Sequence, residues 1–448
     1  MSKKYLTLTS FLMIAAFVLS ACGAAATGGG PAPAAGGELY FLNFKPEVAE
    51  LYEQTIAPAY KEETGVTLKV VTAASGTYEQ TLRSEVAKSD PPVLFQINGP
   101  IGYQSWKDYT ADLSGTELYA HLPDKTMAVT DGDGVYGLPY VVEGYGIIYN
   151  NAIMTAYFAL PNAKAASMDE VNNFAALKEV VEDMQARKAE LGIEGVFAST
   201  SLKPGEDWRW QTHLANVPIF YEFRDNNVVI PSDATKAATF QYNENFKNIF
   251  DLYLNNSVSE PTLLGSKSVD DSMAEFALGK AAMVQNGNWA WNQINAVEGN
   301  TVAAEDVKFL PIYTGMAGEE AQSICVGTEN FFSINSQAPA DKQKLAADFI
   351  WWLFSSPTGK AFVTNDLKFI APFDTFSAAD APDDPLAREV NRYVTDPDLY
   401  NVSWNFVVFP SQTFKDNFGG ALLQYAQGSM EWDAVVDLFV EQWAAESG

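Results

Sequence analysis

The stretch ELYFLNFKPEVAELYEQTIAPAYKEETGVTLKVV, residues 38–71, decides the fold class of this chain. Its first seven residues are rich in the aromatic and apolar side chains typical of a strand, and Pro46 suits the first turn of a helix. Apolar side chains then recur at helical spacing, at Val48, Leu51, Tyr52, Ile56 and Tyr60. Gly65 is expected to end this helix, and VTLKVV (66–71) has the composition of a second strand. The stretch therefore predicts a strand–helix–strand unit.

The same alternation continues along the chain. TYEQTLRSEVAKS (77–89) predicts a polar helix, and PPVLFQIN (91–98) a strand that is buried on both faces, as in a parallel sheet. Residues 170–192 predict another helix, which ends at Gly192 and leads into the strand EGVFAST (194–200). This order predicts an α/β fold in which helices cover largely parallel sheets, and the length of 448 residues suggests two such lobes.

Composition excludes one large class of partners. The chain carries 28 basic and 56 acidic residues, a formal net charge of -28. Nucleic-acid binding depends on lysine and arginine side chains that neutralise phosphates, so we expect no nucleic-acid partner.

The first 22 residues have the pattern of an export signal. Lys3 and Lys4 precede the apolar run LTSFLMIAAFVLS (8–20), which is too short for an ordinary membrane-spanning helix. The sequence Leu-Ser-Ala-Cys that ends at Cys22 resembles the lipobox of bacterial lipoproteins. That resemblance implies cleavage before Cys22, diacylation of its sulfur, and anchoring outside the cytoplasmic membrane, at the cell surface or in the periplasm.

A flexible linker is expected to follow, because residues 23–37 carry no charge and almost nothing that could be buried. If Cys22 is acylated, Cys325 has no partner for a disulfide, so we expect it to be a small core residue.

Candidate binding residues follow from a general property of open α/β sheets, whose ligands bind beyond the carboxyl ends of the strands. The residues placed there are Lys45, Glu47, Asn98 and Gly99, together with Asp207, Trp208 and Trp210 in the stretch KPGEDWRW (203–210). A sugar suits such residues, because its C–H face packs on aromatic rings while its hydroxyls need carboxylates and amides. The alternative is that the tryptophans lie in the core.

The stretch AAMVQNGNWAW (281–291) adds two further candidates. A helix-like run is broken at Asn286, Gly287 and Asn288 and is followed by two tryptophans. We expect the break to end a buried helix, to place Trp289 directly after it, and to keep backbone amides near Asn288 accessible. Trp291 is expected to turn inward.

Enzymatic function has little support in the sequence. The chain has two histidines, and the HExxH, GxSxG, CxxC and P-loop motifs do not occur. A glycosidase needs two facing carboxylates, and 56 acidic residues leave that alternative open.

Four stretches occur in an order that resembles one protein family. They are KEETGVTLKVV (61–71), GLPYVVEGYGIIYNNAIM (137–154), EFALGKAAMVQNGNWAWNQI (275–294) and GTENFFSINSQAPADKQKLAADFIWWLFSSPTGKAF (327–362). Together they are similar to the solute-binding proteins that feed carbohydrate ABC importers, the family of maltose-binding protein.

This resemblance implies a two-lobed, periplasmic-binding-protein-like α/β fold, with a mostly parallel sheet in each lobe and hinge crossovers between them. Lobe 1 would comprise residues 38–142 plus 312–366, and lobe 2 residues 146–311 plus 370–448. Hinges would lie near 143–145, 311 and 367–369.

The resemblance also implies site residues. Glu143 and Trp289 match ligand-contacting positions of the family, Lys45 and Glu47 lie near a charged ligand loop, and residues 206–210 occupy the place of a glutamate and aromatic pair. Tyr145 would face the same way as Glu143 in an extended segment.

The match is incomplete. Asn98 and Gly99 replace a charged pair of the family, so sugar contacts there must differ. The family's aromatic residue near the carboxyl end has no clear counterpart. Trp404 and Glu329 are candidates for that role, with a structural role equally open.

We therefore expect a monomeric binding protein without catalytic residues, cofactor or metal. It would capture a sugar or oligosaccharide between its lobes and deliver it to the permease of an ABC importer. The alternatives are a binding protein for a polyamine, a peptide or iron, and a lipid-anchored glycoside hydrolase.

Overall fold

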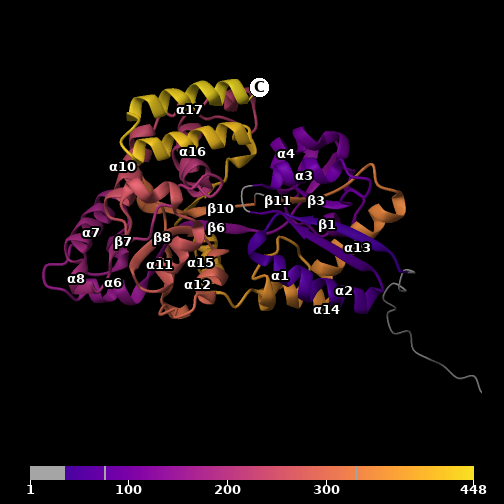
Figure 1. Cartoon of the computed structure of the whole chain (residues 1–448), viewed down its shortest axis with the longest axis horizontal. Helices are drawn as coiled ribbons and strands as arrows, with labels where there is room; N and C mark the ends of the chain where they lie inside the picture. The colour runs from indigo at the N-terminus through magenta and orange to yellow at the C-terminus, as the bar shows by residue number, and fades with distance from the viewer. Residues whose placement is uncertain (1–35, 75–76, 329, 448) are drawn as a thin grey trace, which may run out of the picture.

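The computed structural model describes residues 36–74, 77–328 and 330–447. The chain forms two lobes that lie side by side, each built around one sheet (Figure 1). The two-lobed α/β architecture predicted from the sequence is confirmed. The expected signal peptide, Cys22 and nearly all of the linker lie outside the described residues, as does Glu329.

The first lobe contains a sheet of six strands in the order β2-β1-β3-β11-β5-β4. Strand β1 (Glu38–Asn43) runs parallel to both β2 (Thr67–Thr72) and β3 (Leu94–Asn98). Strand β11 (Asn330–Ile334) is antiparallel to β3 and to β5 (Gly134–Pro139), and β4 (Val129–Asp131) is antiparallel to β5.

The second lobe contains a sheet in the order β12-β10-β6-β8-β7. Its strands are β6 (Glu143–Asn150), β7 (Gly195–Phe197), β8 (Ala281–Gly287), β10 (Gln322–Gly327) and β12 (Tyr400–Ser403), and β9 (Val307–Leu310) also pairs with β6. Only the β10–β12 and β7–β8 pairs are parallel. Both sheets are thus more mixed than expected, because β6 and β11 cross from one lobe and enter the other sheet antiparallel to their neighbours.

Helices cover the faces of both sheets. Those of the first lobe are α1 (Ala49–Leu51), α2 (Ala57–Thr64), α3 (Tyr78–Val86), α4 (Gly99–Trp106), α5 (Glu117–Ala120), α13 (Ala340–Ser355) and α14 (Pro357–Ala361). Those that follow β6 and belong to the second lobe are α6 (Asn151–Phe158), α7 (Phe174–Ala186), α8 (Lys188–Leu191), α9 (Ala215–Asp225), α10 (Asn243–Asn255), α11 (Val269–Ala277), α12 (Ala290–Ala296), α15 (Pro385–Thr395), α16 (Gln412–Ala426) and α17 (Trp432–Glu446).

The helix predicted after Pro46 is confirmed. Continuous helical turns run from Pro46 to Thr64, and one turn, Tyr52–Ile56, is π-helical. Its apolar positions are buried except for Leu51, which is half-buried. Gly65 ends the helix with φ 75°, a left-handed conformation that glycine adopts at little cost.

Alternating side chains of β6 enter two separate cores. Ile147 packs in one apolar cluster with residues of α7, α16 and α17, whereas Ile148 packs in another with residues of α11, α12 and α15. Strand β6 is therefore buried on both faces, as a central strand must be. Cys325 is fully buried in the first of these clusters, as predicted.

The second and third crossings between the lobes differ from the expectation. The predicted return near 311 is wrong, because Ile312 packs in the second-lobe core and β10 still pairs with β6. The chain enters the first sheet only at β11. After residues 367–369 it also stays with the first lobe, since Phe373 lies in that core and Asp380 pairs with Lys360 at 3.1 Å. The second lobe resumes at α15.

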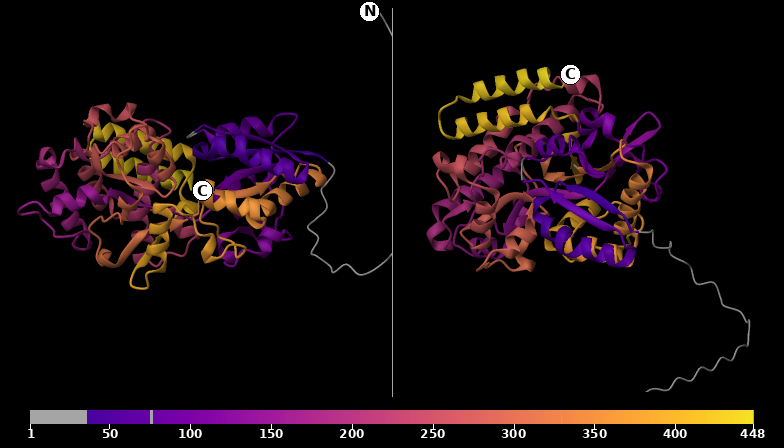
Figure 2. Two further views of the ribbon diagram at one scale, coloured as in Figure 1. Left: turned by 90° about the horizontal axis from the view of Figure 1, so that it is seen from below. Right: turned by 45° about the vertical axis from the view of Figure 1, so that its right-hand side comes forward.

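Helices α16 and α17 form a hairpin that covers one side of the second lobe, with α17 outermost (Figures 1 and 2). Gln412, Lys415 and Asp416 in the first turns of α16 line the cavity described below. Within the described part of the chain, we find no helix with the length and apolar character needed to span a membrane.

Candidate functional site

A cavity of about 460 Å³ lies between the lobes, within the usual size range of small-molecule sites. The first lobe supplies Phe44, Lys45, Pro46, Glu47, Ala74, Tyr78, Glu79, Gln80, Asn98 and Asn330. The second lobe supplies Glu143, Gly205, Glu206, Asp207, Trp208, Gln211, Thr212, His213, Val269, Asp270, Trp289, Gln293, Gln412, Lys415 and Asp416. The first-lobe wall follows the carboxyl ends of β1, β2 and β3, as the general rule for open sheets predicts.

Lys45 connects the two walls of the cavity. Its Nζ lies 2.7 Å from Glu143 Oε1 and 3.4 Å from Glu47 Oε1, and 5.7 Å from the centre of the Trp289 ring. Burial lowers the pKa of Lys45, but the carboxylates of Glu143 and Glu47 outweigh that effect, so the pKa is raised above its ordinary value. Lys45 therefore stays an ammonium group at neutral pH.

Two indole rings form an apolar part of the wall. Trp208 and Trp289 are only half-buried, and their ring centres are 5.9 Å apart. The Arg209 guanidinium lies 4.6 Å from the centre of the Trp208 ring. A Cβ atom on Gly287 would lie 2.2 Å from the Trp289 ring, so only glycine there lets this ring fold back over the end of β8.

His213 is enclosed by aromatic rings and also borders the cavity. Its ring stacks on Tyr145 at 4.4 Å and on Phe406 at 5.2 Å. Burial, followed by the charges of Arg209, Lys415 and Lys45, holds the pKa of His213 well below its usual range. The imidazole is therefore neutral, and it contributes a polar edge to the cavity without a charge.

Two acidic side chains of the cavity have raised pKa values. Burial raises the pKa of Asp207 to about 7, with a further contribution from Asp416, while Arg209 opposes the shift. Burial also raises the pKa of Glu79, against the hydrogen bond that Trp106 Nε1 donates to it at 3.0 Å. Both carboxylates thus lie where water screens charge poorly.

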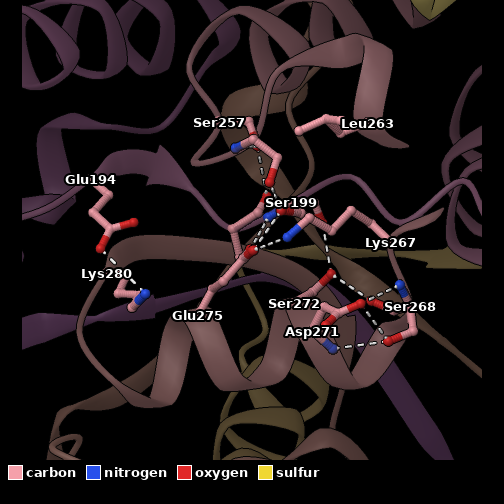
Figure 3. Close-up of polar contacts among 12 residues, drawn as sticks. Glu194, Ser199, Ser257, Leu263, Lys267, Ser268, Asp271, Ser272, Glu275 and Lys280 are labelled. Atoms are coloured by element: carbon pink, nitrogen blue, oxygen red, sulfur yellow. Dashed lines mark hydrogen bonds and ion pairs between the residues drawn. The ribbon is translucent and has the colours of Figure 1, made fainter. Parts of the chain in front are cut away.

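A buried network holds the second-lobe wall in place (Figure 3). Ser199 donates its backbone N–H and its hydroxyl to Glu275 at 2.6 and 2.8 Å, and Lys267 Nζ donates to the same carboxylate at 3.0 Å. Further along, the backbone N–H of Val269 donates to Glu206 at 2.8 Å. These bonds fix the segment after β7 against α11, and both elements contribute residues to the cavity.

The structure brings together seven of the sequence-predicted site residues. Lys45, Glu47, Asn98, Glu143, Asp207, Trp208 and Trp289 all line the cavity. Their contact with a ligand stays a prediction.

Five others do not line it. Trp210 packs on Phe250 and Tyr253, and its Nε1 donates to Ser201 at 3.0 Å. Trp210 therefore lies in the core, which was the alternative interpretation of the tryptophans in this stretch. Gly99 begins α4 with φ 60°.

The remaining three hold the second lobe together around the site. Tyr145 donates its hydroxyl to the carbonyl of His213 at 2.9 Å. Asn288 accepts a hydrogen bond from the Gly144 backbone at 2.9 Å, joining β6 to the end of β8. Trp404 packs against Tyr145. The geometry gives these side chains supporting positions behind the wall.

The expected helix before Trp289 is a strand. Helix α11 ends at Ala277, Gly279 turns the chain with φ 69°, and residues Ala281–Gly287 form β8. A short run that is apolar on both faces is compatible with a buried strand and with a buried helix. Its periodicity therefore could not distinguish the two. Trp291 lies in the core beside α11, as predicted.

Several cavity residues were not predicted from the sequence. Tyr78 and Glu79 follow β2, so the strand-end rule could have found them. The sequence around Lys415 and Asp416 does not mark them as site residues, because α16 reaches the cavity only through the packing of the second lobe.

Comparison with known proteins agrees with this architecture. The structure is similar to a "Chitin oligosaccharide binding protein" (15% identity, TM-score 0.69, 92% of this chain and 99% of that chain) and to "SBP RafE in complex with raffinose" (17% identity, TM-score 0.68, 92% and 100%). It is also similar to "Maltose bound T. maritima MalE3" (12% identity, TM-score 0.65, 91% and 99%). At these identities the similarity establishes the fold.

The amino-acid sequence identifies the family. No sequence among curated proteins matches the chain significantly. The sequence profile described as "Bacterial extracellular solute-binding protein" matches residues 55–389, most of the chain. The chain belongs to this family of bacterial extracellular solute-binding proteins.

Proposed function

We propose that this protein captures a sugar or oligosaccharide in the cavity between its lobes and delivers it to the permease of an ABC importer. The observation that carries the proposal is the pairing of two half-exposed indole rings, Trp208 and Trp289, with carboxylates and Lys45 in one interlobe cavity. Indole faces accept the apolar face of a sugar ring, while charged and amide groups bind its hydroxyls. Three structural neighbours are described with raffinose, stachyose or maltose bound.

Capture would involve no bond breaking. A ligand that contacts both walls favours the closed arrangement, because only that arrangement offers all the contacts. We propose that the lobes rotate about segments 140–142 and 381–384 and near Thr328, which follows β10. An acylated Cys22 would hold the protein at the outer face of the membrane.

A panel of neutral mono- and oligosaccharides, including raffinose, stachyose, maltose and chitin oligosaccharides, tests the proposal by thermal shift and calorimetry. A sugar at one hundred times its dissociation constant should add about 2.7 kcal/mol to the free energy of unfolding. Chromatography of the released ligand should return it chemically unchanged. Binding of none of these sugars or their amino derivatives, or cleavage of the sugar, would contradict the proposal.

A further inference from the structure

We propose that the preferred ligand is a cationic sugar, an oligosaccharide that carries at least one protonated amine. This inference rests on the proposed function, because it assumes that the cavity binds sugar and specifies the charge of that sugar. It follows from an imbalance of charge in the cavity. Of the described residues that line it, seven are acidic and two are lysines, and His213 is neutral.

The two lysines do not balance the carboxylates. Lys45 is held between Glu143 and Glu47, so these three groups together leave one negative charge. Lys415 is the second lysine, and its positive charge favours the ionised form of Glu79 on the opposite wall.

Three further acids of the cavity form no ion pair. Within residues 36–74, 77–328 and 330–447, Asp207, Asp270 and Asp416 take part in no ion pair. Arg209 lies behind the wall, 1% exposed, with its guanidinium donating to Ser201 and to the Glu206 carbonyl. It provides one positive charge for Asp207 and Asp270 but does not reach the cavity.

The charge of one of these acids disfavours ionisation of another. Asp207 and Asp416 come from different elements, and the negative charge of Asp416 adds to the effect of burial in raising the pKa of Asp207, which is 4% exposed. An ammonium group bound between them would remove this repulsion and replace the water that the buried Asp207 carboxylate has lost. Ionisation of Asp207 in this cavity therefore carries an electrostatic penalty that a cationic ligand relieves and a neutral one does not.

A neutral acceptor on the opposite wall points to a ligand with donor groups. Asn330 is 2% exposed and lines the cavity, and its Oδ1 accepts no hydrogen bond from the described residues. A buried acceptor without a partner is costly, and an N–H or O–H donor of a bound molecule would satisfy it. Donors are what a hydroxyl- and ammonium-bearing ligand supplies.

A sugar amine fits better than a linear polyamine. The indole faces of Trp208 and Trp289 offer a flat platform for a ring, and Gln80, Gln211 and Gln293 offer neutral groups for hydroxyls. The buried ammonium of Lys45, already in the cavity, would repel a ligand that carries cations along its whole length.

Calorimetry with three matched trisaccharides tests the inference on the full chain. All share the β-1,4 linkage and differ only at carbon 2 of each ring, which carries a hydroxyl, an acetamido group or a free amine. At about pH 6, below the ordinary pKa of an aliphatic amine, the glucosamine trimer should bind at least about tenfold more tightly than the other two. Raising the salt concentration should shrink this preference, because salt screens charges.

A variant and a matched control locate the effect. Asp416→Asn should lower the ratio of amine to hydroxyl affinity by several fold. Asp437→Asn removes the same charge from the exposed face of α17, away from the cavity, and should leave the ratio unchanged. If both variants lower the ratio equally, the preference comes from the overall negative charge of the protein and the inference fails.

The outcomes separate this inference from the function on which it rests. Equal or tighter binding of the neutral trisaccharides overturns the cationic preference and leaves sugar capture standing. Spermidine binding more tightly than every sugar, with no sugar bound, overturns both.

Discussion

Lys45 shows how much a single side chain can depend on its partners. Lys45 is 5% exposed and its ammonium lies between Glu143 and Glu47, so each charge is tolerable only while the others are present. The same lysine connects the loop after β1 with the first residue of β6. Its ion pairs therefore contribute to the stability of the fold and also join the first lobe to the second.

We predict that Lys45→Met destabilises the protein by about 3 to 5 kcal/mol, because it leaves the buried carboxylate of Glu143 without its cation. Lys69→Met is the matched control. Its ion pair with Asp90 is exposed, with side chains 42% and 72% accessible, and should contribute at most about 1 kcal/mol. Urea unfolding of both variants measures the difference, and equal losses would show that burial of the pair does not matter.

A second residue-scale prediction separates binding from packing. Trp289→Ala should weaken sugar binding by about 1 to 4 kcal/mol with little change in unfolding free energy, because the ring is half-exposed in the cavity. Trp291→Ala should do the reverse and cost about 3 to 5 kcal/mol of stability, because that ring lies in the core. Calorimetry and urea unfolding test the pair. Unaltered affinity in Trp289→Ala would remove this ring from the ligand contacts.

At the scale of elements, the joint between β8 and α12 positions the aromatic wall. β8 is central in its sheet, and Asn288 ties its end to β6. The chain then begins α12 directly after Trp289. The indole is thus placed by a rigid strand and a helix start, which is how precise sites are usually built.

We predict that Gly287→Ala weakens sugar binding several fold, because the added methyl group would occupy the space of the Trp289 ring and push it from the wall. Gly420→Ala on α16 is the control, since nothing lies within 4 Å of its added methyl group. That change should leave affinity unaltered and raise stability by up to about 1 kcal/mol through helix propensity. Normal affinity in Gly287→Ala would show that the ring can shift without consequence.

At the scale of the whole molecule, the site exists only because the two lobes meet. Glu79 of the first lobe and Asp207 of the second both line the cavity, and burial raises the pKa of each carboxylate. At a pH between its two pKa values, a carboxylate whose pKa is higher in the folded than in the unfolded state is protonated in the folded state and ionised in the unfolded state. Its contribution to stability is therefore present below its unfolded pKa of about 3.9 and is lost as the pH rises towards 7.

We predict that Asp207→Asn becomes more stable relative to wild type as the pH rises from about 4 to 7, by at most about 4 kcal/mol. Urea unfolding of the two proteins at a series of pH values gives this difference directly. Asp384, whose pKa burial raises to about 6, is present in both proteins and cancels in the comparison. A difference that does not vary with pH would place Asp207 in a hydrated environment.

The local elements and part of the first-lobe wall could be predicted from the amino-acid sequence. The helix after Pro46 and its stop at Gly65 follow from spacing and backbone preference, which act over a few residues. Lys45 and Asn98 were placed in the cavity by one rule about strand ends.

Long-range packing determines which tryptophans face the cavity and where the chain passes between the lobes, so neither could be predicted from the sequence. Trp208 and Trp210 have the same sequence signal, yet one borders the cavity and the other packs on Phe250. Lys415 reaches the site because α16 packs on the second-lobe core. Periodicity reports whether a side chain is buried, whereas the surface that buries it depends on contacts between segments distant in the chain.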